Sequence, residues 1–435
     1  MTATDRYGFQ HGAGGPALAA FAEATHAFVS YRTHALAALD QALAAAPALV
    51  AAYALRGFLL LLPARPELLP DAAKAQAFAH AAGTSTADEA TLLRALDLAL
   101  AGQQRQAAGV LETRVVANPA ALLLVKLANM LRFLSGDLPG LVGGMAQMLP
   151  AWTADMASYG YVLGCQAFAL EEAGDPDGAG RLGRAALDHA PDDAWAVHAV
   201  AHIHEMAARA EDGMAWLEAR RPAWTGCGGF GFHLAWHLAL LHLERGDHAR
   251  VLELYDSEVR PTPTEEVRDI ANAVSLLWRL RQEGVAVGHR WDELAAIARR
   301  RREETELLFG TLHHLLALLA TGDLLAAEAL VCAVRREAAG VRDQSAVARQ
   351  AGLPLAQALL ALTQQGRPRG LQVLARQLQP LGGSHAQRDV WVRTLAQAAG
   401  GMGAAAALED IRAARRALRR QDRFDRTLHV AGHAA

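Results

Sequence analysis

The chain has 435 residues, 52% of them hydrophobic and 6% aromatic, and its formal net charge at pH 7 is −3. So large an apolar fraction excludes a disordered chain, and so small a charge gives no reason to expect nucleic acid or an anionic membrane as a partner. Alanine and leucine dominate while runs of β-branched residues are scarce, which favours helices by intrinsic propensity.

Cysteine usage and the N-terminal sequence bear on the cellular compartment. Cys165, Cys227 and Cys332 are far apart and form no CxxC pair, which argues against a disulfide framework and for a reducing compartment. The N-terminus lacks the charged and apolar regions of a secretory signal. The most apolar run, residues 51–63, is too short to cross a bilayer. We therefore expect a soluble, cytoplasmic protein.

Three segments carry small residues at matching offsets and then a proline. They end at Pro47, Pro119 and Pro191, so the pattern recurs every 72 residues, or twice about 36. A tetratricopeptide unit is about 34 residues long, and its two helices pack closely through small residues before a proline closes the second helix. The alanines at these offsets are therefore expected to be buried between helices: Ala35, Ala42, Ala107, Ala179 and Ala186.

Helices and turns alternate along the rest of the chain in the same way. Glycine followed by aspartate, as at Gly174-Asp175 and Gly246-Asp247, is typical of a helix end with the next N-cap beside it. No stretch shows the sustained alternation of a strand. The sequence thus predicts an all-α protein, a right-handed α-solenoid of tetratricopeptide-type helix pairs. We expect an N-terminal loop over residues 1–15 that folds back onto the array, a single superhelix over 16–421 and a C-terminal tail over 422–435.

Two glycine-rich segments interrupt the repeat. Residues 223–231 (AWTGCGGFG) and 381–389 (LGGSHAQRD) each precede a helix, and Ser384 is placed to cap the second of these. Glycine permits positive φ and close backbone approach, which suits either a tight turn or a ligand. A plain turn is the commoner case.

Histidines concentrate in two neighbouring helices, expected over residues 193–209 and 232–245, with a partner helix over 211–221 between them. His198 and His202, like His233 and His237, are four residues apart and so share a helix face. The two pairs are separated by 35 residues, close to one repeat. Aligning the helices on their terminal turns instead gives a shift of 38, which places His198 beside Trp236 and His237. Either register brings the imidazoles together.

This group suits a divalent metal such as zinc. His198, His202, His233 and His237 offer imidazole ligands, and Glu205 could act as a further ligand or as a general base. The motif is not the metalloprotease HExxH, since residue 199 is alanine. The alternative is that the histidines fill inner positions of the array and hydrogen-bond one another.

Other polar residues are weaker candidates. Tyr161 and Cys165 lie one repeat before the histidines, although a buried, inert thiol is the better interpretation of Cys165. His313 lies on a later first helix and could face the same surface or the core. Arg388 and Asp389 follow the second glycine segment and could bind a ligand or form a charge pair at a helix start. The basic run 412–420 is interpreted as a solvated helix face.

Four stretches carry a family resemblance: YGYVLGCQAFALEEAGD, DAWAVHAVAHIHEM, HLAWHLALLHLERGD and GGSHAQRDV. They resemble the tetratricopeptide-repeat protein 38 family, which includes StaR-like proteins found near antibiotic-biosynthesis genes, and the likeness extends from Tyr7 to about Leu395. It implies an all-helical repeat fold and no established reaction. The family's motif positions are occupied here by His198, His202, Glu205, His233, Trp236, His237, His313, Gln387, Arg388 and Asp389. The chain departs from the pattern at Cys165, His204 and Thr311, where methionine, an aliphatic residue and aspartate are usual.

Two functions of different classes follow from these patterns. The first is a scaffold that holds a peptide or small molecule in a concave groove. Its ligand-binding side chains would be Tyr161, His198, His202, His233, Trp236, His237, His313, Arg388 and Asp389. The second is a metal-assisted, hydrolase-like enzyme in which the four clustered histidines bind the metal and Glu205 is the base. The sequence leaves homo-oligomerisation open.

Overall fold

The structure is a computed structural model that describes residues 2–12 and 14–428. The predicted tail beyond Leu428 lies outside the described residues. The elements up to residue 190 are β1 (Ala3–Thr4), β2 (Gln10–His11), α1 (Pro16–Val29), α2 (Ala35–Ala45), α3 (Val50–Leu61), α4 (Leu69–Ala82), α5 (Ala87–Leu100), α6 (Gln104–Ala117), α7 (Leu122–Leu134), α8 (Leu138–Met148), α9 (Tyr159–Glu172) and α10 (Pro176–His189).

The remaining long and short α-helices follow without strands between them. They are α11 (Ala194–Met206), α12 (Ala210–Ala219), α13 (Arg221–Trp224), α14 (Gly229–Arg245), α15 (His248–Leu254), α16 (Val267–Gln282), α17 (Arg290–Arg300), α18 (Leu308–Ala320), α19 (Leu324–Ala338), α20 (Asp343–Val347), α21 (Leu353–Thr363), α22 (Leu371–Arg376), α23 (His385–Gly401), α24 (Ala405–Leu418) and α25 (Arg423–Thr427). Single turns of 3₁₀ or π geometry are η1 (Pro66–Leu68), η2 (Leu149–Ala151), η3 (Tyr255–Val259), η4 (Ala348–Gly352) and η5 (Gln379–Leu381).

The chain forms two compact units. The first comprises the residues up to Val200 together with Arg220–Gly231, and the second comprises Ala201–Ala219 together with the residues from Phe232 onwards. The boundary between them passes through helices α11 and α14. The predicted single superhelix over residues 16–421 stays a prediction.

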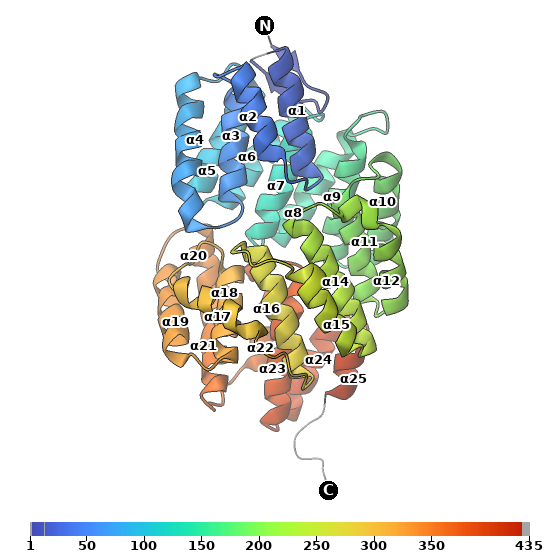
Figure 1. Cartoon of the computed structure of the whole chain (residues 1–435), viewed down its shortest axis with the longest axis vertical. Helices are drawn as coiled ribbons and strands as arrows, with labels where there is room; N and C mark the ends of the chain where they lie inside the picture. Colours follow the sequence, from blue (N-terminus) through green and yellow to red (C-terminus); the bar gives the residue numbers. More distant parts are fainter. Residues whose placement is uncertain (1, 13, 429–435) are drawn as a thin grey trace. The chain divides into compact units, whose positions relative to one another are not determined.

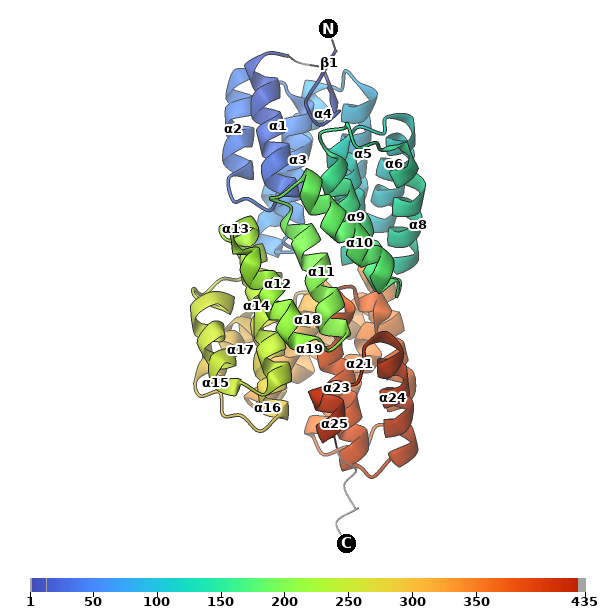
Figure 2. The same cartoon turned by 90° about the vertical axis from the view of Figure 1, so that its right-hand side faces the viewer.

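Within the first unit, consecutive helices pack as pairs, and the pairs stack. Helix α1 contacts α2, α3 contacts α4 and α9 contacts α10, while the first helices of neighbouring pairs also touch, as α3 does α5 and α7 does α9 (Figure 1). In the second unit, α18 contacts both α17 and α19, α23 contacts α24, and α16 contacts α18 and α23 (Figure 2). These contacts confirm the predicted all-α fold of stacked helix pairs.

The repeat read from the prolines is visible in the backbone. Helices α2, α6 and α10 each end two residues before Pro47, Pro119 and Pro191. The residue between helix and proline leaves the helical region with φ of −143°, −134° and −134°, because a proline disfavours helical geometry in the residue before it. The five alanines expected between helices are all buried, at 7% exposure or less.

Helix ends follow the predicted glycine–aspartate pattern. Gly174 has φ +86° and Gly246 has φ +76°, conformations that a side chain would strain. Each following aspartate caps the next helix: Asp175 accepts from the N–H of Gly178 at 2.9 Å, and Asp247 from that of Arg250 at 3.3 Å.

The N-terminal segment folds back as expected, as a small hairpin in the first unit. Strand β1 pairs with β2 in antiparallel register, Ala3 opposite His11. The backbone N–H groups of Gln10 and Gly12 then donate to Asp88 and Glu89, at the start of α5, at 2.8 and 2.9 Å.

Both glycine-rich segments are turns. The first is shorter than predicted, because α13 extends to Trp224 and α14 begins at Gly229. At the second, Ser384 accepts from the N–H of Gln387 at 3.2 Å while the side chain of Gln387 accepts from the N–H of Ser384 at 2.9 Å, a capping box that confirms the predicted cap. None of the described helices is both long and apolar enough to cross a membrane.

Candidate metal centre

Helices α11 and α14 carry the clustered histidines. His202 and Glu205 lie on one face of α11, and His233, Trp236 and His237 lie on one face of α14, since residues three and four apart align along a helix. The Nε2 atoms of His202 and His237 are 3.2 Å apart. This contact, between residues 35 apart, is the one that the 35-residue register predicts.

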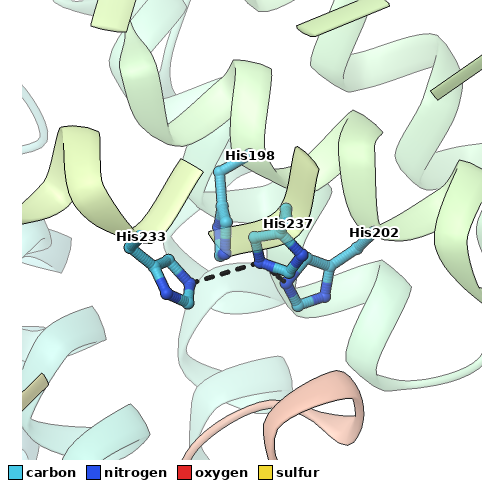
Figure 3. A group of neighbouring side chains, drawn as sticks. All are labelled: His198, His202, His233 and His237. Carbon is cyan, nitrogen blue, oxygen red and sulfur yellow. Dashed lines mark hydrogen bonds between the residues drawn. The ribbon is translucent and has the colours of Figure 1, made fainter. Parts of the chain in front are cut away.

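Three imidazoles of the second unit, those of His202, His233 and His237, direct their Nε2 atoms toward one another. His237 Nε2 lies 3.2 Å from His202 Nε2 and 3.3 Å from His233 Nε2 (Figure 3). His198 lies one turn before His202 on α11, and one ligand atom of each of the four histidines lies within 4.8 Å of the others. The four side chains belong to residues that are at most 3% exposed, so they do not line an open groove.

The opposite ring nitrogens of two histidines meet hydrogen-bond acceptors. His237 Nδ1 lies 2.8 Å from a Glu205 carboxylate oxygen, and His233 Nδ1 lies 2.9 Å from the amide oxygen of Asn272. Because both partners accept, both Nδ1 atoms carry the proton of the neutral ring. The Nε2 atoms of His233 and His237 then each carry a lone pair, and no proton lies between these two atoms, which are 3.3 Å apart.

A continuous chain of hydrogen bonds does not run through the three histidines. His202 can donate to His237, but His237 cannot in turn donate to His233 while its proton is held by Glu205. A tetrahedral zinc ion with nitrogen ligands at 2.0–2.1 Å would separate those nitrogens by about 3.3 Å. Two of the nitrogen pairs lie 3.2 and 3.3 Å apart, close to that separation.

Burial sets the charge state of the group. It lowers the pKa of His237 to about 4 and that of His233 well below its ordinary value. Burial alone would raise the pKa of Glu205, but the hydrogen bond with His237 and the charges of His237 and Arg419 outweigh it, and the pKa falls to about 2. At neutral pH the rings of His233 and His237 are therefore neutral and the Glu205 carboxylate is ionised, which is the state that metal binding requires.

Helix α16 completes the surroundings with two residues that sequence reasoning missed. Asn272 fixes His233, and Ser275 accepts from the Trp236 indole N–H at 3.1 Å. The indole stacks on the His233 ring with centroids 5.3 Å apart and planes at 15°. A signal was available: Asn272 and Ser275 each follow their partner by 39 residues, as polar positions in an otherwise apolar stretch of the next first helix.

Beyond Glu205 lies a buried network of arginines and aspartates. Arg419 approaches Glu205 Oε1 at 3.5 Å. Arg415 donates to both oxygens of Asp389, at 2.6 and 2.9 Å, and to both oxygens of Asp422, at 2.8 and 2.5 Å. Arg415 and Arg419 are only 6% and 8% exposed, so the interpretation of residues 412–420 as a solvated face is wrong for these two. Of their carboxylate partners, Asp422 follows closely in the sequence, whereas Asp389 comes from the preceding helix α23.

The other sequence candidates lie in separate surroundings. The Tyr161 hydroxyl donates to Asp192 at 2.7 Å in the first unit, and burial raises its pKa. Cys165 is buried as expected, and burial raises the pKa of its thiol to about 11. His313 belongs to the core: its Nδ1 donates to the carbonyl of Phe309 at 2.8 Å, and burial lowers its pKa to about 3.

Arg388 and Asp389 do not pair with each other at the start of α23. The Arg388 guanidinium donates to the carbonyls of Gly382, at 3.2 Å, and Gly383, so it closes the glycine turn. Both residues line a cleft of about 350 Å³ in the second unit, whose apolar walls include Leu378 and Ile411. Their predicted place in a ligand site is therefore compatible with a cavity, although not with the histidine cluster.

No family model matches the chain. Among solved structures, the chain is similar to the TPR domain of P58(IPK), with 15% sequence identity over 80% of this chain and 90% of that chain, and a TM-score of 0.21. With a score this low, the assignment of a helical-repeat fold rests on the helix contacts, the caps and the proline spacing of the chain itself.

Proposed function

We propose that this protein is a metal-binding helical-repeat scaffold. A divalent transition metal such as zinc would be held by His202, His233 and His237, with His198 as the fourth ligand, and would tie α11 to α14. One observation carries the proposal: the Nε2 atoms of His233 and His237 face each other at 3.3 Å while both Nδ1 protons are committed to Asn272 and Glu205. Two facing lone pairs repel, and a cation between them removes the repulsion.

The surrounding residues favour a structural over a catalytic metal. Glu205 binds the ring nitrogen that points away from the proposed ion, so it orients His237 and is not placed as a ligand or as a general base. Four imidazole ligands fill a tetrahedron, whereas catalytic zinc keeps one position for water. The near-complete burial of the four histidines points the same way. A hydrolase-like reaction at this centre is therefore the less favoured alternative.

Elemental analysis of the tag-free protein tests the proposal. Chain expressed with zinc in the medium, then dialysed against metal-free buffer, is expected to retain about one zinc per molecule. A variant with His202→Ala and His237→Ala provides the matched control and is expected to retain none. Equal and negligible metal in both would overturn the proposal.

The scaffold's ligand is proposed to be a peptide or small molecule bound in the second unit. The cleft of about 350 Å³ beside Arg388 and Asp389 falls in the size range of small-molecule sites and has mainly apolar walls with a few charged groups. We propose Ala414→Trp, which would fill this cleft, as the test. It should abolish the stabilisation that a peptide or small molecule gives the parent chain. Retained stabilisation would place that peptide or small molecule outside the cleft.

The sequence stretches around the histidines support membership of the tetratricopeptide-repeat protein 38 family as a proposal. A reducing, cytoplasmic location is proposed on the same footing, because Cys165 and Cys227 are buried free thiols and Cys332 is an exposed one.

A further inference from the structure

The last segment of the described chain fastens the ends of both histidine-bearing helices. The backbone N–H of Arg420 donates to the carbonyl of Met206 at 2.8 Å, and the Arg419 guanidinium donates to that of Glu205 at 3.3 Å. These carbonyls belong to the last turn of α11, where acceptors lack helical partners and a positive charge is favourable. The same segment therefore both caps α11 and supplies its terminal cation.

Helix α14 is held by the residues that follow. The side chain of Glu244, near the end of α14, accepts from the N–H of Arg423 at 2.7 Å and from the Arg426 guanidinium at 3.1 Å. The tail predicted over residues 422–435 is thus, as far as Leu428, a packed part of the second unit.

One side chain of this segment reaches the surroundings of the proposed metal. Arg419 Nη1 lies 3.5 Å from Glu205 Oε1, and the other oxygen of that carboxylate accepts the Nδ1–H of His237 at 2.8 Å. Arg419 is itself fixed by Asp422 at 3.2 Å and by Asp389 at 3.4 Å. An unbroken line of contacts joins these two aspartates to a metal-facing imidazole.

We infer that Arg419 is a positioning residue for the metal centre. It holds the buried Glu205 carboxylate in the orientation that keeps the proton of His237 on Nδ1 and its lone pair on Nε2, toward the metal. The inference rests on the proposed function. It adds that metal affinity depends on Arg419, which lies 214 positions after Glu205 in the sequence, in a segment that contributes no ligand. A carboxylate without its guanidinium can rotate away, and this change loosens His237.

The test measures zinc affinity of the full chain by competition with a chromophoric chelator. Arg419→Gln is expected to weaken zinc binding about 10–100-fold, the usual effect of losing a residue that orients a metal ligand. Arg419→Lys, which keeps the charge, is expected to restore part of the loss. The matched control is Arg416→Gln on the same helix, because Arg416 is exposed and pairs with Glu409. It should bind zinc as the parent does.

A double variant separates positioning from general stability. If Arg419 acts through Glu205, adding Arg419→Gln to Glu205→Gln should weaken zinc binding no further than Glu205→Gln alone. Additive losses, or an Arg419→Gln variant with parental affinity, would overturn the inference while leaving the metal centre intact. Should Arg419→Gln fail to fold, Arg419→Lys is combined with Glu205→Gln in the same way. A parent chain that binds no zinc would instead overturn the proposed function, and the inference with it.

Discussion

Helices α14 and α18 both carry buried histidines, yet they place them in different chemistry. On α14, His233 and His237 each have an acceptor for Nδ1 and direct Nε2 toward other imidazoles. On α18, His313 gives its Nδ1 proton to a backbone carbonyl of its own helix, and its ring packs against Phe309 and Trp391 with centroids 4.5 and 4.8 Å away. Neither ring nitrogen of His314 has a hydrogen-bond partner among the described residues.

The difference between the two helices shows that burial of histidines is not enough to form a metal site. Adjacent residues such as His313 and His314 point to different sides of a helix, whereas residues four apart point to the same side. A site also needs a second helix with histidines at the same height, and acceptors behind the rings to fix their tautomers. Helix α14 has the second histidine helix in α11 and its acceptors in Glu205 of α11 and Asn272 of α16. On α18 only His313 has such an acceptor among the described residues, the carbonyl of Phe309, and no hydrogen bond joins it to a second histidine there.

The largest effect is expected when two of the proposed metal ligands are removed. His202→Ala with His237→Ala should lower zinc affinity by more than the roughly 100-fold that loss of an orienting residue costs, because two ligands are removed. His313→Ala is the matched control, a buried histidine on a comparable helix, and should leave zinc affinity unchanged. Competition titration with a chelator measures both. Equal losses in the two variants would mean that general core damage, not ligation, is being observed.

The next largest effect is expected at the residues that accept hydrogen bonds from the Nδ1 atoms of the ligand rings. Glu205→Ala and Asn272→Ala should each weaken zinc binding about 10–100-fold, since each removes the acceptor that fixes a ligand's tautomer. Ser275→Ala removes the neighbouring hydrogen bond to Trp236 and should change zinc affinity far less. If all three variants behave alike, the acceptors do not orient the ligands.

Much of this arrangement follows from sequence spacing. The proline period, the glycine–aspartate ends and the alanine offsets depend on contacts within one repeat, and the histidine pairs depend on helix periodicity and repeat length. Asn272 was missed because an isolated asparagine is an ordinary helix residue until its partner one repeat away is known. Arg415 and Arg419 were assigned to solvent although Asp422 lies close by in the sequence, because their other partners, Asp389 and Glu205, are contributed by other helices. The burial of these charges depends on those distant contacts, which periodicity does not encode.

A smaller effect is expected at the close contacts between helices that small side chains make, such as those of α10 with α9. These contacts are apolar, whereas the histidine contacts between α11 and α14 are polar. Ala179 is fully buried on α10, which packs against α9. Ala179→Leu should lower the free energy of unfolding of the chain by about 1–3 kcal/mol through overpacking. Arg181→Leu on the exposed side of the same helix should change it little. Chemical denaturation measures both, and an unchanged midpoint for Ala179→Leu would show that the repeat register is wrong.

The last prediction concerns how the stability of the chain depends on pH through the buried His314 of α18. Burial, and then the charge of Arg301, lowers the pKa of His314 to about 4, with Glu265 opposing the shift. The unfolded chain, with a pKa near 6.5, therefore binds the proton first, and stability falls as the pH drops from about 6.5 toward 4 by about 1.4 kcal/mol per pH unit. His314→Gln should reduce the slope of the parent by that amount, as measured by denaturation between pH 5 and 6.5, while the other buried histidines with lowered pKa, His233, His237 and His313, keep their contributions. A parental slope in the variant would show that His314 does not titrate in this range.

X-ray absorption at the zinc edge of the loaded, tag-free protein tests directly whether four histidines bind the metal. We expect a first shell of four nitrogen scatterers at about 2.0–2.1 Å, with the outer-shell features of imidazole rings. Loss of His237 should reduce the imidazole contribution while His313→Ala leaves the spectrum unchanged. A first shell of sulfur at about 2.3 Å, or of oxygen without imidazole features, would contradict a centre built from His198, His202, His233 and His237.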